Sequence, residues 1–260
     1  MIRRFCSQAW LNAKVNHGGL DIAEFLAFRV GVSILTLVVY CLIAYHIKGQ
    51  LDLTHWVVGN AFALCVYECI FGLGGCFDAE RFYGRLRTII VSPTSKLTVI
   101  MYNGVYSLLT AFLTISVAFV VGGLIFGVQF NELNLLMFIL AILVATFACV
   151  GFGLLLAVCA LITDSMFLML NAIAMLILIF SGANFPVTQL PVFAQWIAHI
   201  FPLSRSVQAA NMSFNGYFTY EFSNLLISEV VLGVSFFIFA FFLIRLVERI
   251  AIKRATLELF

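Results

Sequence analysis

Long apolar runs separated by short polar stretches make up most of this chain. Each run approaches or exceeds the roughly 20 residues that a helix needs to cross the hydrocarbon core of a membrane. The runs are continuous and do not alternate with a period of two, which favours helices over the strands of a barrel. The sequence therefore predicts an all-α membrane protein with six transmembrane helices, at about Phe25–Ile47, His55–Phe77, Leu97–Phe126, Leu133–Ile162, Met166–Ala183 and Leu225–Leu246.

The segments at the start of the chain and before the last span also carry helical patterns. Residues 1–22 place apolar side chains, Trp10 among them, on one stripe, which predicts an interfacial helix on the cytoplasmic surface. Residues 184–224 hold apolar residues at helical spacing, but the prolines make this segment too short to span the membrane. We expect a re-entrant helical pair in the outer leaflet, because protein must shelter such broken backbone.

The placement of lysines and arginines predicts the orientation. One side of the six-span topology holds Arg3, Arg4, Lys14, Arg29, Arg81, Arg85, Arg87, Lys96, Arg245, Arg249, Lys253 and Arg254, and the other holds only Lys48 and Arg205. Basic residues concentrate on the cytoplasmic side of membrane proteins. Both termini are therefore expected in the cytoplasm. Residues 1–19 are too polar to contain the apolar core of a cleaved signal peptide.

The composition agrees with a multi-pass membrane protein. Hydrophobic residues make up 63% of the 260 residues and charged residues 10%, against roughly 25% charged residues in soluble domains. The net charge of +2 is spread over the ends of the spans, so no nucleic-acid partner is expected.

The cysteines and histidines do not form a recognisable metal motif. The seven cysteines include no C-x-x-C pair, and no histidine stands at ligand spacing from them. Cys65 and Cys69 share a helix face, where packing is the commoner role. We expect no metal site.

A charged, amphipathic segment, residues 79–93, joins the second and third spans. Phe82, Leu86, Ile89 and Ile90 form an apolar stripe, and Arg81 and Arg85 stand four residues apart on another face. Ser92-Pro93 ends the helical pattern. From periodicity alone, a solvated cytoplasmic loop and a helix that docks a partner are equally supported.

This segment resembles the signature of the ABC-2 type permeases, in which E-R-E-x-G-T-L-E-x-L-L-V-S/T-P follows the second span. The positions that match are Glu80, Arg81, Gly84, Leu86, Ile89, Ile90, Val91, Ser92 and Pro93. Phe82, Arg85 and Arg87 depart from it and make the segment more basic. The run Phe180-Ser181-Gly182-Ala183-Asn184-Phe185-Pro186, with Leu190-Pro191 and Phe201-Pro202-Leu203, is similar to the family's outer region.

The resemblance covers the whole chain and implies one domain, 1–260. Its parts would be an interfacial helix (1–22), five spans (25–183) with the coupling helix (79–93), the outer region (184–224), and the sixth span with a tail (225–260). In this family two permeases form a dimer of twelve spans, and each rests on a cytoplasmic ATPase.

The coupling helix implies which residues would receive motion from that ATPase: Glu80, Arg81, Gly84, Arg85, Leu86, Arg87 and Pro93. The sequence has no G-x-x-x-x-G-K-[ST] loop to cradle phosphates. This chain is therefore expected to bind no cofactor and to be no enzyme, with ATP and magnesium held by a separate ATPase chain. A second permease, identical or related, would complete the transporter in a bacterial-type cytoplasmic membrane.

The resemblance also implies a substrate path at the dimer seam, between the second and fifth spans. Its candidate residues are Tyr67, Glu68, Phe71, Met169, Asn171, Met175 and Phe180. The carboxylate of Glu68 either contacts cargo or forms a structural pair with Arg81 or the N-terminal helix. Asn171 either contacts cargo or hydrogen-bonds between helices. Candidates for an outer gate, or for simple interfacial aromatics, are Phe185, Trp196 and Phe201.

The apolar, aromatic character of this seam favours an exporter of amphipathic drug-, peptide- or lipid-like cargo. A polysaccharide or glycolipid exporter is the alternative within the family. Outside it stand a membrane-embedded enzyme, for which Glu68 offers only an isolated acid, and a non-transporting immunity or scaffold protein.

Overall fold

The computed structural model describes residues 22–48, 53–76, 96–130, 133–160, 165–184, 186–215 and 217–254. Every regular element in these ranges is helical. The elements are α2 (Ile22–Lys48), α3 (Thr54–Cys69), the π-helical turn η1 (Ile70–Gly74), α6 (Lys96–Phe126), α7 (Leu135–Cys159), α8 (Met166–Phe180), η2 (Val187–Gln189), α9 (Val192–Ile200), α10 (Ser204–Met212), η3 (Ser213–Asn215) and α11 (Tyr220–Arg254).

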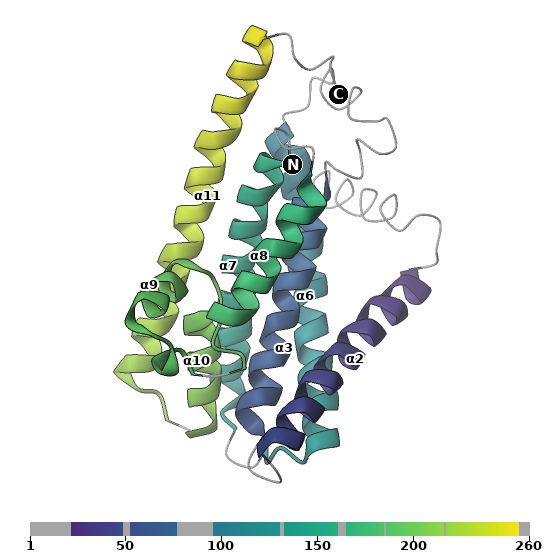
Figure 1. The fold of residues 1–260 in the computed structure, drawn as a ribbon, viewed down its shortest axis with the longest axis vertical. Helices are drawn as coiled ribbons and strands as arrows, with labels where there is room; N and C mark the ends of the chain where they lie inside the picture. The colour runs from purple at the N-terminus through teal and green to yellow at the C-terminus, as the bar shows by residue number, and fades with distance from the viewer. Residues whose placement is uncertain are drawn as a thin grey trace.

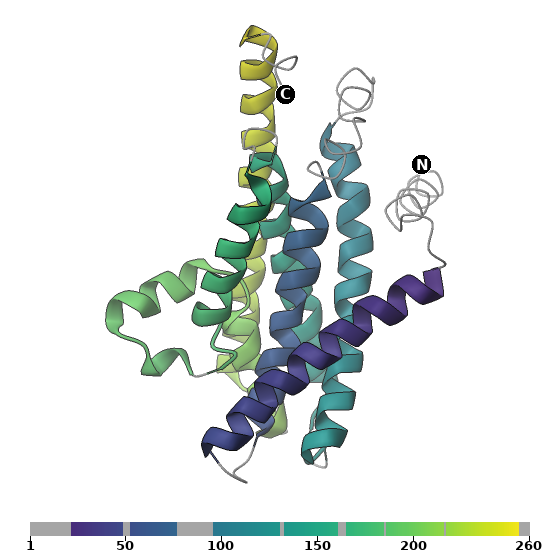
Figure 2. The same cartoon turned by 45° about the vertical axis from the view of Figure 1, so that its right-hand side comes forward.

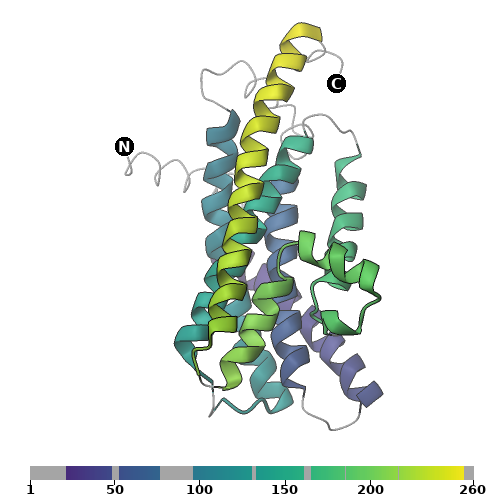
Figure 3. The same cartoon turned by 90° about the vertical axis from the view of Figure 1, so that its left-hand side faces the viewer.

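The long helices form an upright bundle that α2 crosses obliquely on its outside, against α3 and α6 (Figures 1 and 2). Helices α3, α6, α7 and α11 stand side by side, whereas α8 and α9 lie on one flank (Figure 3). Long helices that follow one another in the chain run in opposite directions. Helix α11 ends at the top of the bundle, whereas α2 runs obliquely from about mid-height to the lower end (Figure 1).

Among the described residues, four helices are long and apolar enough to cross a membrane: Thr54–Gly74, Asn103–Phe126, Leu135–Cys159 and Tyr220–Leu246. Val30–His46 and Met166–Phe180 are shorter apolar helices. These helices confirm an all-helical, multi-pass membrane protein. All six stand where a span was expected, although six complete crossings remain a prediction.

Two of the expected helical segments cannot be compared with the structure, because the interfacial helix (1–22) and the coupling segment (79–93) lie outside the described residues, apart from Ile22 at the start of α2. The last span is longer than expected. Helix α11 begins at Tyr220, five residues before the predicted start, and continues to Arg254.

Helix α3 is the centre of the bundle. In the most apolar part of Thr54–Gly74, which comprises α3 and η1, 83% of the residues are buried, against 22% in the most apolar part of α11. Helices α2, α6, α7, α8 and α10 all pack on α3 or on η1, which continues it. Helix α11 therefore lies at the periphery and presents a broad apolar face to the surroundings, while α3 is enclosed by its neighbours.

The most extensive helix contact joins α7 to α11, and small residues allow it. A β-carbon on Gly151 would lie 2.9 Å from the carbonyl oxygen of Gly233. Beside this crossing the rings of Phe147 and Phe237 pack 5.1 Å apart. Without a hydrophobic driving force between helices in lipid, such close backbone approach supplies much of their attraction.

Candidate functional site

The turn that follows α8 packs directly on the backbone of α3. Gly182 adopts a φ of +74° just after α8 ends, a conformation that costs glycine little. Ala183 is then fully buried against Gly59 of α3. A β-carbon on Gly59 would overlap the backbone of Ala183, so glycine is required at this position.

Polar side chains close the same junction. The Asn60 amide nitrogen donates to the Oδ1 of Asn184 at 3.2 Å and to the carbonyl of Trp56 at 2.9 Å. The hydroxyl of Ser181 accepts the backbone N–H of Ala183 at 3.3 Å. Asn60 and Ser181 are both buried. These bonds give a physical reason for the Ser181–Asn184 motif: it fixes the end of α8 to α3.

Beyond this junction, aromatic rings connect α3 to α8. Tyr67 stacks on Phe71 with ring centroids 5.9 Å apart and planes 4° apart. Phe71, in η1, contacts Phe167 of α8 at 6.4 Å. Phe167 was not among the candidate residues, although it stands one helical turn before Asn171, which was. Since π-helical turns often mark functional sites, η1 draws attention to Phe71.

The outward face of α8 is apolar and uncovered in the single chain. Met175 is 54% exposed, and Phe167, Leu168, Leu176 and Ile179 are exposed as well. Met169 instead packs against the core. The amide of Asn171 donates to the carbonyl of Phe167 at 2.8 Å, within its own helix.

Glu68 is buried in the last turn of α3, with 4% of its surface exposed. Its neighbour Tyr67 is only half buried. The carboxylate therefore lies inside the bundle. Arg81, one of its expected partners, lies outside the described residues, so cargo contact and structural pairing both remain predictions.

The aromatic residues expected at an outer gate occupy different environments. Trp196 lies on α9 and is 72% exposed, beside the exposed Val192, Phe193 and Ile200. Phe201 turns inward, where its ring stacks on Phe180 at 6.0 Å and meets the edge of Phe152 at 6.1 Å. Phe185 lies outside the described residues.

A buried acid that the sequence analysis did not single out holds the segment between α9 and α10 against α11. Glu229 of α11 is fully buried. Its Oε1 accepts the backbone N–H of Leu203 at 2.6 Å, and its Oε2 lies 3.5 Å from Nη1 of Arg205. Glu229 is thus a second buried acid, besides Glu68, within the predicted spans.

This group, which we call the hairpin anchor (Leu203, Ser204, Arg205 and Glu229), ties three helices together. Arg205 also donates to the carbonyl of His199 at the end of α9, at 3.0 Å. The hydroxyl of Ser204 donates to the carbonyl of Ala198 at 3.0 Å. The anchor thus satisfies backbone groups of both short helices where the chain reverses between them.

Leu203 adopts a φ of +95° at the start of α10. Such a conformation costs a residue other than glycine about 1–3 kcal/mol. The side chain of Leu203 is fully buried and its N–H points to a carboxylate, and these two contacts offset the strain. The sequence carried a signal for this acid, since Glu229 interrupts an apolar run within the sixth span.

Four of the described cysteines lie in the apolar core: Cys41, Cys65, Cys69 and Cys149. The sulfur atoms of Cys65 and Cys69 are 3.8 Å apart. Within the described ranges no group of three or more histidine, cysteine or acidic side chains could hold a metal ion. Packing accounts for the positions of these four thiols.

Comparison with known families decides what kind of protein this is. The profile of the ABC-2 type transporter family matches residues 20–215, three quarters of the chain. The chain belongs to the ABC-2 type transporter family. The match runs from the start of α2 through α10 and so includes the junction of α3 with α8. No curated protein matches the sequence.

As a member of this family, the chain is a permease, the membrane subunit of a transporter. Such subunits typically catalyse no reaction themselves and work with an ATPase subunit. The junction of α3 with α8 and the hairpin anchor then acquire a context. Both hold segments of the permease in place where the chain reverses direction within the bundle.

The close contact at Gly59 can be tested by adding one methyl group. Gly59→Ala should lower the thermal stability of the permease in detergent, because overpacking costs about 1–3 kcal/mol. Gly31→Ala is the matched control, since a β-carbon on Gly31 would meet nothing within 4 Å. That control should unfold at the same temperature or higher. Equal losses in both variants would contradict the close packing of α3 on Ala183.

The hairpin anchor can be tested with a double-mutant cycle. Glu229→Gln should destabilise the permease markedly, because removing one member of a buried pair costs up to about 3–5 kcal/mol. Arg205→Gln added to it should cost less than it does alone, with a coupling of about 0.5–3 kcal/mol. Glu221→Gln, on the exposed first turn of α11, is the control and should change little. Additive losses would show that the two side chains do not interact.

Proposed function

We propose that the chain is the membrane subunit of an ABC exporter. It moves an amphipathic drug-, peptide- or lipid-like cargo out of the cytoplasm, driven by a separate ATPase chain. Two permease subunits, identical or related, meet along α8 and form the path between them.

The observation that carries this proposal is the contrast between the two sides of α8. Its inner side is buried against the bundle at Met166, Leu170, Ala174 and Ile177, and the turn that follows it is fixed to α3 through Gly59 and Asn60. Its outer side is a row of exposed apolar residues. In the single chain that row lies against lipid, and a second permease would replace the lipid there by packing of side chain on side chain.

The character of this face also supports the class of cargo. Methionine and aromatic side chains adapt to apolar molecules of varied shape, and Met175 and Phe167 are the most prominent of them on α8. Asn171 is the one polar side chain among the residues of α8, and one of its N–H groups is already bonded to the carbonyl of Phe167. A polysaccharide path would need several such polar groups.

The arrangement of the helices supports the proposed topology. Successive long helices alternate in direction, and α2 runs away from the end of the bundle where α11 finishes (Figure 1). With the basic residues on the cytoplasmic side, this end faces the cytoplasm. The hairpin of α9 and α10 then enters the outer leaflet without crossing it. Because α10 packs between α7, α11 and α3, protein shelters its ends from lipid.

Energy would reach the bundle through residues 79–93, which lie directly before α6. ATP binding to the partner closes the ATPase pair, and this segment transmits the closure to η1 and α6. In physical terms the nucleotide biases an equilibrium between two arrangements of the helices.

Purification of the tagged chain in mild detergent, followed by mass spectrometry, tests the proposal. A nucleotide-binding ATPase should be recovered in equal amount, and a related permease in the same fraction would indicate a heterodimer. If no ATPase is recovered, and cross-linking from Arg81 to Arg87 also captures none, the exporter proposal fails. An embedded enzyme or a scaffold protein would then be favoured.

Charge reversal tests the coupling segment. The double variant Arg81→Glu, Arg85→Glu should retain its fold but lose cargo-dependent ATP hydrolysis, because the acidic groups of the partner would repel it. Lys14→Glu changes a basic residue of the N-terminal segment and serves as the control, with coupling expected to persist. Unchanged coupling in the double variant would contradict a docking role for these arginines.

A further inference from the structure

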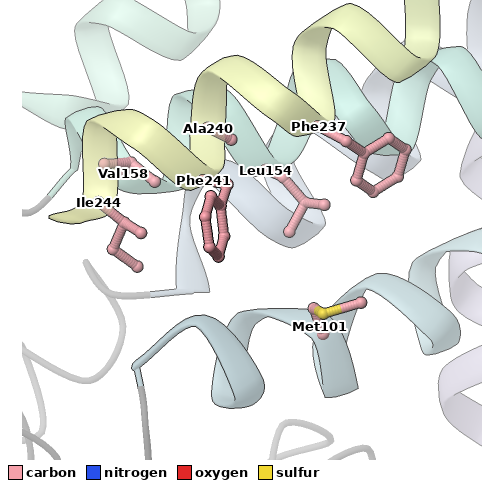
Figure 4. A pocket seen from close by; sticks show the side chains of 7 residues that line it. All are labelled: Met101, Leu154, Val158, Phe237, Ala240, Phe241 and Ile244. Atoms are coloured by element: carbon pink, nitrogen blue, oxygen red, sulfur yellow. The ribbon is translucent and has the colours of Figure 1, made fainter.

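An apolar pocket lies between α6, α7 and α11, away from the face of α8. It encloses about 200 Å³ and is lined by Met101, Leu154, Val158, Phe237, Ala240, Phe241 and Ile244. In Figure 4, Met101 on α6 faces across the space toward Leu154 of α7 and Phe241 of α11. The α8 residues and the hairpin anchor have no part in it.

The walls of the pocket decide which chemistry it suits. Every lining side chain is apolar, and Val158, Ala240 and Ile244 are almost wholly buried at its base. An apolar cavity of about 150 Å³ stays dry and accepts a hydrocarbon such as benzene. A space of this size therefore suits several methylene groups of an acyl chain better than water or a folded partner.

A cation stands against one of the residues that line the pocket. The guanidinium of Arg245 lies 4.3 Å from the ring centroid of Phe241, which lines the pocket. Arg245 itself is exposed, so its charge is available to a ligand while the aromatic ring holds its position. Helix α6 begins with Lys96, five residues before Met101, at the same end of the bundle.

We propose that this pocket binds one anionic phospholipid from the cytoplasmic leaflet, with an acyl chain along the apolar walls and the phosphate on Arg245. Basic residues beside pockets between helices on the cytoplasmic side suit anionic headgroups, and a fork of guanidinium donors matches phosphate oxygens. This inference rests on the proposed orientation of the chain.

The site has a mechanical consequence, because all three of its helices reach the end of the bundle that the proposed orientation places at the cytoplasm (Figure 1). Helix α6 follows the coupling segment directly, and α11 bears the cation. A lipid seated between them would fill the gap and hold α6 and α11 at a fixed spacing. The leaflet composition would thereby influence the stability of the permease.

Native mass spectrometry of the full chain tests the site. The protein, purified in mild detergent, would be mixed with phosphatidylglycerol or with phosphatidylcholine of the same acyl chains. The wild type should retain phosphatidylglycerol about fivefold better than phosphatidylcholine, the factor expected from one basic residue near an anionic headgroup. Arg245→Gln should remove this preference and retain the two lipids equally.

Two further variants test the apolar part. Met101→Trp fills the pocket from its partly exposed rim, and should reduce retention of both lipids without disturbing the buried base. Val231→Trp places the same bulk on an exposed position of α11 outside the pocket, and should retain lipid as the wild type does. Equal retention by the wild type, Arg245→Gln and Met101→Trp would overturn the proposal. The recovery of an ATPase is measured separately, so either result leaves the test of transport intact.

Discussion

The hydrogen bond and ion pair that Glu229 makes inside the bundle are the interactions on which the hairpin of α9 and α10 depends. In a membrane no water is available to the backbone groups that a chain reversal exposes. The protein must supply their partners. Glu229 accepts a hydrogen bond from the N–H of Leu203, whose backbone is strained. Arg205, paired with Glu229, donates to the carbonyl of His199 at the end of α9. Helices α9 and α10, which are too short to span a membrane, are thereby held against the bundle.

The same requirement explains why the junction of α3 with α8 is built as it is. Helix α8 ends in a tight turn at Gly182, and the polar groups of that turn meet Asn60 and Ser181 inside the protein. Because Ala183 occupies the space that a side chain at position 59 would need, α3 and the turn approach to backbone contact. One side of α8 is fixed by these contacts, which leaves the other side for a partner.

Two classes of helix therefore share the bundle. Helix α3 is enclosed and determines the positions of its neighbours, whereas α8 and α11 each carry an apolar face that the single chain leaves uncovered. The face of α8 fits a second permease in the proposed transporter. The pocket beside α11 fits the chain of a lipid. The permease would thus contact its protein partner through α8 and a membrane lipid through the pocket beside α11, on different sides of the same fold.

Much of this fold could be predicted from the sequence, because spans in a membrane require long continuous apolar runs. All six expected spans correspond to helices, and the short helices α9 and α10 were anticipated as a re-entrant pair from prolines such as Pro191 and Pro202. The ends were less predictable. Helix α11 extends at both ends into residues whose polarity suggested loop or tail.

The candidate site was predicted only in part. Stacking of Tyr67 on Phe71 follows from their spacing of four residues, and the resemblance pointed to both. The role of Phe167 depends on how α8 is rotated against η1, which one sequence does not reveal. Glu229 could have been found by asking why an acid interrupts the last apolar run. Its partners could not, because Leu203 and Arg205 meet it only through the reversal between α9 and α10.

The central claim is that two permeases meet along α8 and that nucleotide changes their contact. The most direct test is a photo-reactive amino acid at Met175, with Leu35 on the exposed face of α2 as the matched control, in membranes that contain the partner ATPase. The account predicts that position 175 links two permease chains, that position 35 does not, and that trapping the ATPase with a non-hydrolysable nucleotide changes the yield. Adducts with lipid alone at position 175, in every nucleotide state, would contradict it.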